Sequence, residues 1–136
     1  MNYQDQDTYG IYRGHKGPGP RLMGANTLDG NDVYNKADED LGDIKEIMLD
    51  VPSGKIAYAV LSFGGFLGMG DKLFAVPWGA LQLDTENKRF VLDMDKEKLK
   101  DAPGFEKDAW PDMADAAFAK KVHSYYGVTP YSDGLM

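Results

Sequence analysis

The sequence contains no cysteine and only two histidines among its 136 residues. The lack of cysteine excludes a disulfide framework, a thiolate zinc site and a cysteine nucleophile. His15 lies in a glycine-rich stretch and His123 lies near the end of a predicted helix, so the two imidazoles do not suggest a catalytic triad or a zinc site. The sequence therefore predicts no catalytic residue, no metal site and no cofactor.

The chain also lacks a long apolar run and an excess of basic residues. Its longest apolar-rich stretch, residues 56–69, is interrupted by a serine and three glycines and is too short to span a bilayer as a helix. Residues 1–20 have no apolar core of a secretory signal. The formal charge of −7 makes a phosphate backbone an unfavourable partner. These features predict a soluble, cytoplasmic protein without membrane insertion or direct nucleic-acid binding.

The chain divides into three segments by composition. Residues 1–20 hold four glycines and two prolines with no periodic apolar pattern, which predicts a flexible N-terminal tail. Residues 21–95 alternate short apolar runs with turn signals, as in an all-β barrel or sandwich. Residues 96–136 show helical spacing in short pieces and are predicted to form a C-terminal helical extension.

Six or seven strands are predicted in the central segment. Residues 22–28 and 32–35 are expected to form a hairpin in which Gly30 supplies a positive φ. The irregular apolar spacing of residues 43–50 indicates a strand with a bulge. The following strand, residues 55–63, is apolar on both faces, so both must be covered. The remaining predicted strands are residues 72–78, 80–84 and 88–94.

Two helices are predicted near the C-terminus. Residues 96–101 form a short helix that Pro103 stops, and a longer helix begins at Trp110 and runs to about Tyr126. Gly127 occupies the position of a C-terminal cap. The longer helix has one apolar stripe, which we expect to cover the outside of the barrel; dimerisation through this stripe is the alternative.

The glycine-rich stretch at residues 64–70 invites comparison with a phosphate-binding loop. Such a loop opens a helix, whereas the residues that follow are predicted to form a strand, so a hairpin turn is the favoured interpretation. Phe66, Leu67 and Met69 are large apolar residues at this turn. Apolar groups on a loop either fold over the end of a barrel or form a contact patch, which makes these three the candidate interaction residues.

Many short signals in one order resemble the PRC-barrel domain. They are Val33, Asn35, Glu39, Leu41-Gly42, Ile44, Glu46, Leu49-Asp50, Gly54, Ile56, Tyr58, Val60, the glycine-rich turn, Lys72 and Ala75-Val76-Pro77-Trp78. This domain is shared by the reaction-centre H subunit, the ribosome maturation factor RimM and stand-alone bacterial and archaeal proteins. The resemblance implies a small, highly bent antiparallel β-barrel that serves in docking and has no established catalytic residue. Asp38 stands where the family often has glycine, and aspartate tolerates a left-handed backbone better than most residues.

The sequence and the resemblance together predict a non-enzymatic protein–protein interaction or assembly module. We expect it to form a homodimer, or to bind an unidentified protein partner, through the turn at residues 64–70 and an adjoining barrel face. One alternative is a ribosome-assembly or RNA-processing accessory that acts through protein contacts. A second alternative is a small-ligand binder with a pocket between the barrel and the C-terminal helix.

Overall fold

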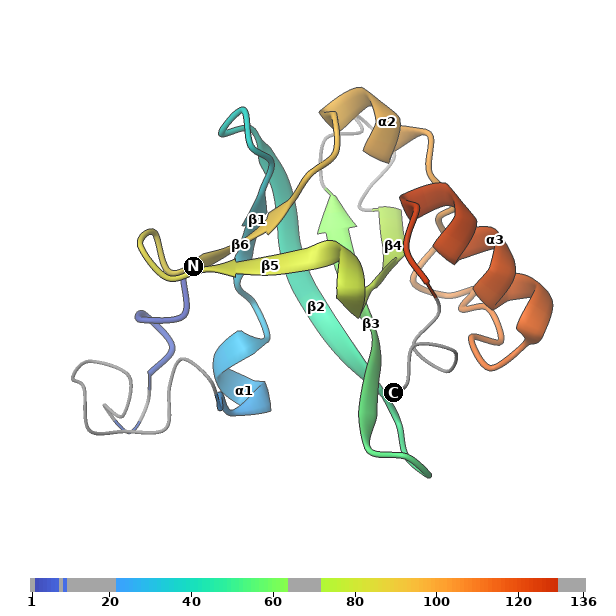
Figure 1. The fold of residues 1–136 in the computed structure, drawn as a ribbon, viewed down its shortest axis with the longest axis horizontal. Coiled ribbons are helices and arrows are strands. Elements are labelled where there is room, and N and C mark those ends of the chain that lie inside the picture. Colours follow the sequence, from blue (N-terminus) through green and yellow to red (C-terminus); the bar gives the residue numbers. More distant parts are fainter. Residues whose placement is uncertain (1, 8, 10–21, 64–71, 130–136) are drawn as a thin grey trace.

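A computed structural model shows a strongly curled six-stranded sheet with helices at its margins (Figure 1). The structure describes residues 2–7, 9, 22–63 and 72–129. The helices and strands are α1 (Ala25–Leu28), β1 (Asp32–Tyr34), β2 (Asp40–Asp50), β3 (Lys55–Phe63), β4 (Lys72–Pro77), the 3₁₀ turn η1 (Trp78–Ala80), β5 (Leu81–Asp84), β6 (Arg89–Leu92), α2 (Lys96–Lys100) and α3 (Ala116–Tyr126).

The strands are ordered β4-β3-β2-β1-β6-β5 across the sheet. Neighbouring strands are antiparallel except β1 and β6, which pair in parallel. The predicted fold class, a mainly β, highly bent barrel-like sheet with a C-terminal helix, is therefore confirmed. The parallel pair differs from the fully antiparallel pairing that we expected.

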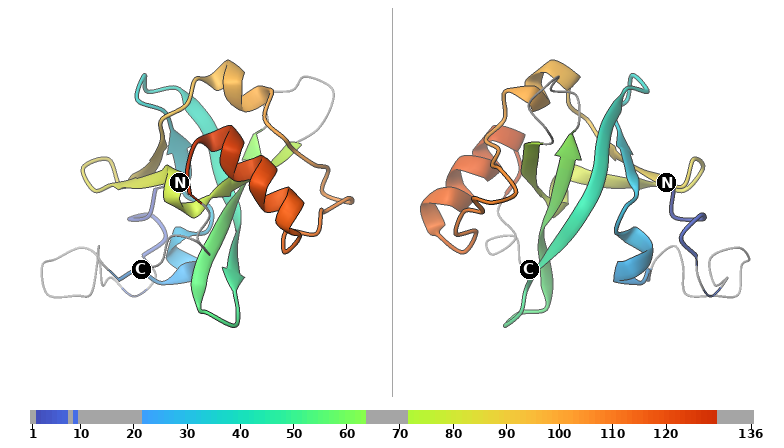
Figure 2. Two further views of the ribbon diagram at one scale, coloured as in Figure 1. Left: turned by 45° about the vertical axis from the view of Figure 1, so that its right-hand side comes forward. Right: turned by 180° about the vertical axis from the view of Figure 1, so that it is seen from behind.

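The hairpin of β2 and β3 is the longest feature of the sheet. β1 pairs only with residues 40–43 of β2, and β4 pairs only with residues 58–63 of β3. The other end of this hairpin therefore extends beyond the rest of the sheet, as Figures 1 and 2 show. The pairing register of β2 with β3 shifts twice along this length, which confirms the predicted bulge.

The central strand β3 is buried on both faces, as its sequence predicts. Ala59, Leu61 and Phe63 belong to the main core inside the curled sheet. Ala57 and Tyr58 belong to a second, smaller cluster with residues of β4 and α3. Two separate apolar layers thus hold this one strand, which explains why it alternates little between apolar and polar residues.

Helix α3 covers the outer side of the sheet, as expected. Val122 is buried against the β3 cluster, and the ring of Phe118 meets that of Tyr58 edge-on at 5.9 Å. Gly127 ends the helix with φ of 70°, and its N–H donates to the carbonyls of His123 and Ser124. The helical stripe that the sequence predicts therefore packs within this chain.

The predicted start of α3 at Trp110 is wrong, because the helix begins at Ala116. Asp115 is the N-cap and accepts a hydrogen bond from the backbone N–H of Ala117. The preceding residues form a separate turn in which the Asp112 side chain accepts from the N–H of Ala114. The Asp112 side chain thus takes a backbone donor in a separate turn, and Asp115 caps the helix, which therefore starts five residues after Pro111.

The strand predicted at residues 22–28 is also wrong, because its second half forms the short helix α1. The side-chain amide of Asn31 donates to the backbone carbonyls of Thr27 and Leu28. The side-chain amide of Gln6 also donates to the backbone carbonyl of Thr27, at 2.9 Å. These bonds satisfy carbonyls that a hairpin partner would otherwise take. Because one of the donors lies about twenty residues away in sequence, local pattern does not reveal it.

The first residues of the predicted flexible tail contact the sheet. Tyr3 is buried, and its N–H donates to the carbonyl of Lys88 at 2.9 Å. Asp7 is buried as well. In the described range 2–7 the tail is thus packed against the domain.

Candidate interaction surface

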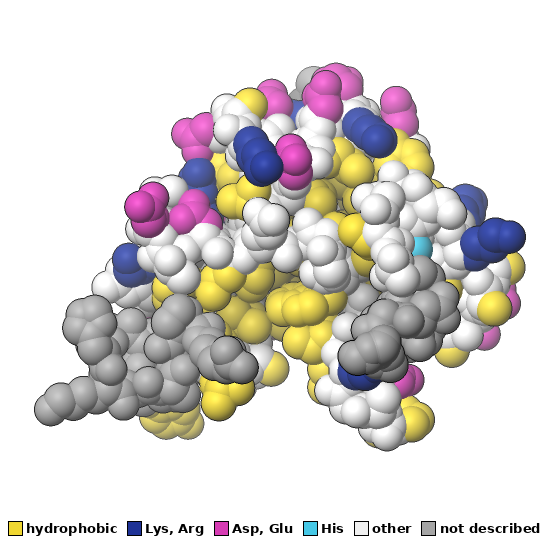
Figure 3. Space-filling view, in the orientation of Figure 1, with side chains coloured by type: hydrophobic (Ala, Val, Ile, Leu, Met, Phe, Trp, Pro, Cys, Tyr) yellow, Lys and Arg dark blue, Asp and Glu magenta, His cyan; other side chains and the backbone are white. Residues whose placement is uncertain are grey.

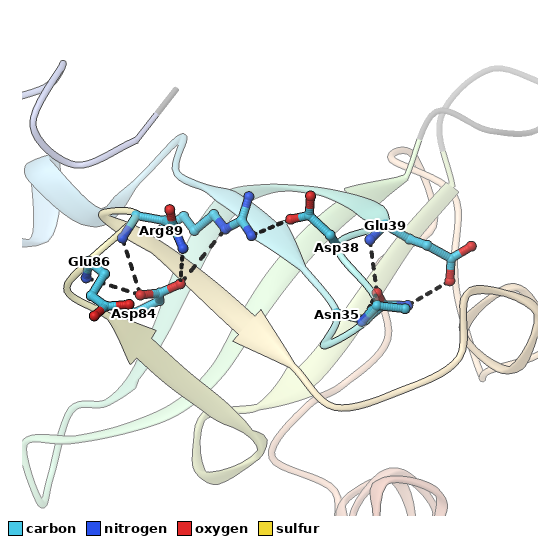
Figure 4. Close-up of polar contacts among 8 residues, drawn as sticks. Asn35, Asp38, Glu39, Asp84, Glu86 and Arg89 are labelled. Carbon is cyan, nitrogen blue, oxygen red and sulfur yellow. Dashed lines mark hydrogen bonds and ion pairs between the residues drawn. The ribbon is translucent and has the colours of Figure 1, made fainter.

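A polar cluster at the tight β1–β2 turn holds the backbone of that turn in place (Figure 4). Asn35 is buried, and its side-chain oxygen accepts from the N–H groups of Ala37 and Glu39. Its amide nitrogen donates to the Glu39 carboxylate at 2.8 Å and to the carbonyl of Met94 at 3.2 Å. Asp38 lies in this turn with φ of 64°, so the expectation that it tolerates a left-handed backbone is confirmed.

Arg89 links this turn to the β5–β6 turn. Its guanidinium lies 3.9 Å from the centre of the Tyr34 ring, and one of its nitrogens contacts the Asp38 carboxylate at 2.5 Å. Hydrogen bonds from Asn87 hold the pKa of Asp84 below its usual value. The polar residues of Figure 4 therefore bond one another and the backbone, which is a structural role.

We expect the replacement of Asn35 with alanine to lower the free energy of unfolding by about 2 kcal/mol, since it leaves buried donors and acceptors unpaired. Urea denaturation measures this change. Replacement of the exposed Asn87, whose hydrogen bonds are on the surface, is the control and should cost under about 1 kcal/mol. Equal costs for the two variants would contradict the role given to Asn35.

An acidic depression of about 350 Å³ lies beside this turn. Its lining includes the carboxylates of Asp32, Asp40 and Asp43, together with the cationic Lys96. The negative charge of Asp40, followed by burial, raises the pKa of Tyr34 nearby. Among the residues that the structure describes, no three or more histidine or acidic side chains come together as metal ligands do. His123 is buried against the Tyr58 ring.

The projecting end of the β2–β3 hairpin exposes large apolar side chains. Leu49 is 55% exposed and Val51 is 84% exposed. Trp110, 43% exposed, lies in the segment before α3 beside this hairpin end, with its ring 5.0 Å from that of Phe105. We call Leu49, Val51 and Trp110 the exposed apolar residues.

One groove lies between the hairpin and the segment that precedes α3, and we call it the Trp110 groove. Its volume is about 290 Å³. Its lining residues are Met48, Leu49, Asp50, Ala57, Tyr58, Trp110, Pro111, Asp112, Met113 and Ala114. The groove is mostly apolar and contains two methionines, whose flexible side chains adapt to the shape of a bound group.

A second groove, of about 150 Å³, lies between α1 and the opposite side of the hairpin, and we call it the α1 groove. Figure 3 shows hydrophobic side chains gathered in the hollow between α1 and the projecting hairpin. Met23, Ile47 and Ile56 are among its apolar residues, and Asp29 and Glu46 are its acidic ones. Burial, followed by the negative charge of Glu46, raises the pKa of Asp29. Both grooves thus combine an apolar floor with carboxylates.

The interaction residues predicted from the sequence, Phe66, Leu67 and Met69, lie outside the described residues. Their role stays a prediction. Sequence reasoning did not find the exposed apolar residues at the hairpin end. The available signal was Leu49-x-Val51, an apolar pair beside a turn, but only the extent of strand pairing shows that this part of the hairpin is uncovered.

The described residues define a small, curled β domain in which the polar clusters hold turns and one hairpin end exposes large apolar side chains. The family profile of the PRC-barrel domain matches residues 20–99. Since this range is more than half of the chain, the chain belongs to the PRC-barrel domain family, as its motifs suggest.

Among solved structures, the chain is similar to that of a putative 16S ribosomal RNA processing protein RimM from Pseudomonas aeruginosa. The two share 18% sequence identity with a TM-score of 0.37, and the match covers 61% of this chain. It covers 49% of the other chain, so the likeness extends over about half of that protein. No curated protein sequence matches this chain. Within the described parts of the chain, no helix is both long enough and apolar enough to cross a bilayer.

Proposed function

We propose that this PRC-barrel protein is a non-enzymatic interaction module that self-associates through the projecting end of its β2–β3 hairpin. One observation carries the proposal: the exposed apolar residues lie together at this end, with an apolar groove on each side. Apolar side chains that meet at one surface, with grooves beside them, are typical of protein-binding sites.

The absence of a chemical role for the polar clusters supports a non-enzymatic function. Asn35 and Arg89 have partners within the fold that account for their burial or their position. The described residues that line the Trp110 groove include carboxylates but no lysine, arginine or histidine. A site for acid–base or nucleophilic chemistry needs such groups to converge around a substrate.

Replacement of Leu49 and Val51 with serine should weaken self-association at least about tenfold, because each exposed apolar residue contributes to binding only when covered by a partner. The melting temperature should change little, since both side chains are exposed in the single chain. Sedimentation velocity over a range of protein concentrations measures the association, and thermal unfolding measures the stability.

Gln82→Ser is the matched control, because Gln82 is an exposed strand residue in β5, away from the hairpin end. This variant should associate like the original chain. A chain that remains monomeric at high concentration would refute self-association, and equal association of all three proteins would exclude the hairpin end as the contact.

The predicted contribution of Phe66 and Leu67 is tested in the same way. If they are docking residues, replacing both with serine weakens association and leaves the melting temperature nearly unchanged. A large fall in melting temperature would instead assign them to the core.

The two alternatives that the sequence left open have their own tests. Co-sedimentation with ribosomal subunits tests a ribosome-assembly accessory that acts through protein contacts. A fluorescence titration that follows Trp110 tests a small-ligand binder, because this side chain lines the groove beside the C-terminal segment. A cytoplasmic location stays a prediction.

A further inference from the structure

One stretch of this sequence carries basic residues without any acidic ones. Residues 9–22, which we call the basic segment, contain Arg13, Lys16 and Arg21 but no aspartate or glutamate. With these three removed from its 15 basic residues, the rest of the chain has 12 bases against 22 acids, a charge of −10. The basic segment also carries the apolar or aromatic residues Tyr9, Ile11, Tyr12 and Leu22.

The Trp110 groove has the complementary chemistry. Among the described residues that line it, Asp50 and Asp112 are the charged ones. An exposed tryptophan face beside carboxylates suits a lysine or arginine, which is attracted both to the ring and to the acid. The apolar floor formed by Met48 and Met113 suits an aromatic or aliphatic side chain next to that cation.

We propose that the basic segment of one copy binds in the Trp110 groove of a second copy. Its apolar residues contact the floor of the groove, and Arg13 and Lys16 lie beside Asp50 and Asp112. This inference rests on the proposed function, since it states which surfaces carry the self-association. It also explains how an acidic domain associates with itself, because contact between two bodies of charge −10 is otherwise opposed by repulsion.

The position of the residues that flank the basic segment favours a second copy. Gln6, which precedes it, donates a hydrogen bond to Thr27, and α1 follows shortly after its end. α1 lies on one side of the projecting hairpin, whereas the segment before α3 lies on the other side in both views (Figures 1 and 2). The hairpin therefore stands between the basic segment's own attachment and the Trp110 groove of the same copy.

Two charge variants of the full chain test the inference by sedimentation. Arg13→Glu with Lys16→Glu reverses the charge at two positions of the basic segment, and we expect this variant to associate at least about tenfold more weakly. Asp50→Asn with Asp112→Asn removes the groove carboxylates but keeps a side-chain oxygen for Ser53 and for the Ala114 N–H. It should weaken association several-fold, because it removes the carboxylates that attract the basic segment.

Combining both pairs of substitutions measures their coupling. In the chain with glutamates at residues 13 and 16, the two asparagines should strengthen association, because they remove carboxylates that repel the new acids. Lys36→Glu with Lys98→Glu is the matched control: both lysines are exposed and outside the groove, and their replacement makes the same change in net charge. This control should retain at least half of the original affinity.

Trp110 reports directly on the groove. A Trp78→Phe chain with glutamates at residues 13 and 16 has Trp110 as its one tryptophan and a disabled basic segment of its own. A synthetic peptide of residues 9–22 should shift the emission of Trp110 and saturate. The same peptide with glutamates at residues 13 and 16 should bind at least about tenfold more weakly.

The outcomes separate this inference from the proposed function. If serines at residues 49 and 51 abolish association but neither charge variant changes it, the inference is overturned and the proposed function is retained. A monomeric chain that binds no peptide overturns both. The Trp110 emission of the original chain is also compared with that of the glutamate variant over a range of protein concentrations. If the difference is the same at every concentration, the basic segment binds within one copy, and the proposed contact between copies is overturned.

Discussion

Replacement of Gly42 with alanine is expected to lower the free energy of unfolding by about 4 kcal/mol, a large part of the stability of a domain this size. Gly42 lies in β2 with φ of 113°, a conformation that L residues rarely adopt. A Cβ atom built at this position would overlap the backbone carbonyl oxygen of Ser62 on the neighbouring strand. Because backbone atoms cannot rotate away, the two strands would have to separate.

Gly54→Ala is the matched control, since Gly54 also has a positive φ, 77°, but no atom lies within 4 Å of the added Cβ. It should cost only the backbone strain, about 1 to 2 kcal/mol. Urea denaturation of both variants gives the difference. Equal losses would show that β2 and β3 do not approach as closely at Gly42 as the structure indicates.

Replacement of Phe74 with alanine should cost a similar amount, about 4 kcal/mol. Phe74 lies in β4, is fully buried and packs in the main core inside the curled sheet. The loss combines the transfer of a large apolar group with the cavity left behind, because the surrounding strands cannot close around it. Thermal and urea unfolding should both report the change.

Val51→Ala provides the comparison for Phe74, as Val51 is an apolar residue at the exposed hairpin end. Its free energy of unfolding should stay within about 0.5 kcal/mol of the original. A small effect at Phe74 would indicate that β4 is not part of the central core. A large effect at Val51 would indicate that the hairpin end is covered, either within the single chain or by a second copy.

Strands with strong patterns could be predicted from the sequence. The bounds of β3 and the burial of both its faces follow from a run of apolar residues between two turn signals. The bulged β2, the short helix α2 and the cap at Gly127 also follow from local chemistry. The PRC-barrel resemblance rests on residues such as Asn35 and Gly42, whose structural roles depend on turn bonds and close backbone approach.

The two wrong elements have a common cause. Near α1 and before α3, backbone groups are satisfied by side chains such as Gln6, Asn31 and Asp112. Polar side chains that bond nearby backbone override weak helix or strand preferences. The partners of these side chains depend on which segments meet in the fold. The spacing of apolar residues along the sequence does not show which segments meet.

The candidate surface could be predicted only in part. The sequence indicated a strand that is apolar on both faces and a net negative charge, but it placed the contact at residues 64–70, which the structure does not describe. The structure located apolar exposure at Leu49, Val51 and Trp110. These residues are distant in sequence, and their neighbourhood arises because the segment before α3 lies beside the hairpin.

The sequence by itself determined the family, the β character and the acid-free basic segment of this protein, since these depend on local spacing and composition. Only the tertiary structure decided that β1 and β4 cover part of the long hairpin and leave its other end exposed between two grooves. The physical reason is that strand pairing is a contact between distant segments: its extent depends on how the sheet curls and where each strand stops.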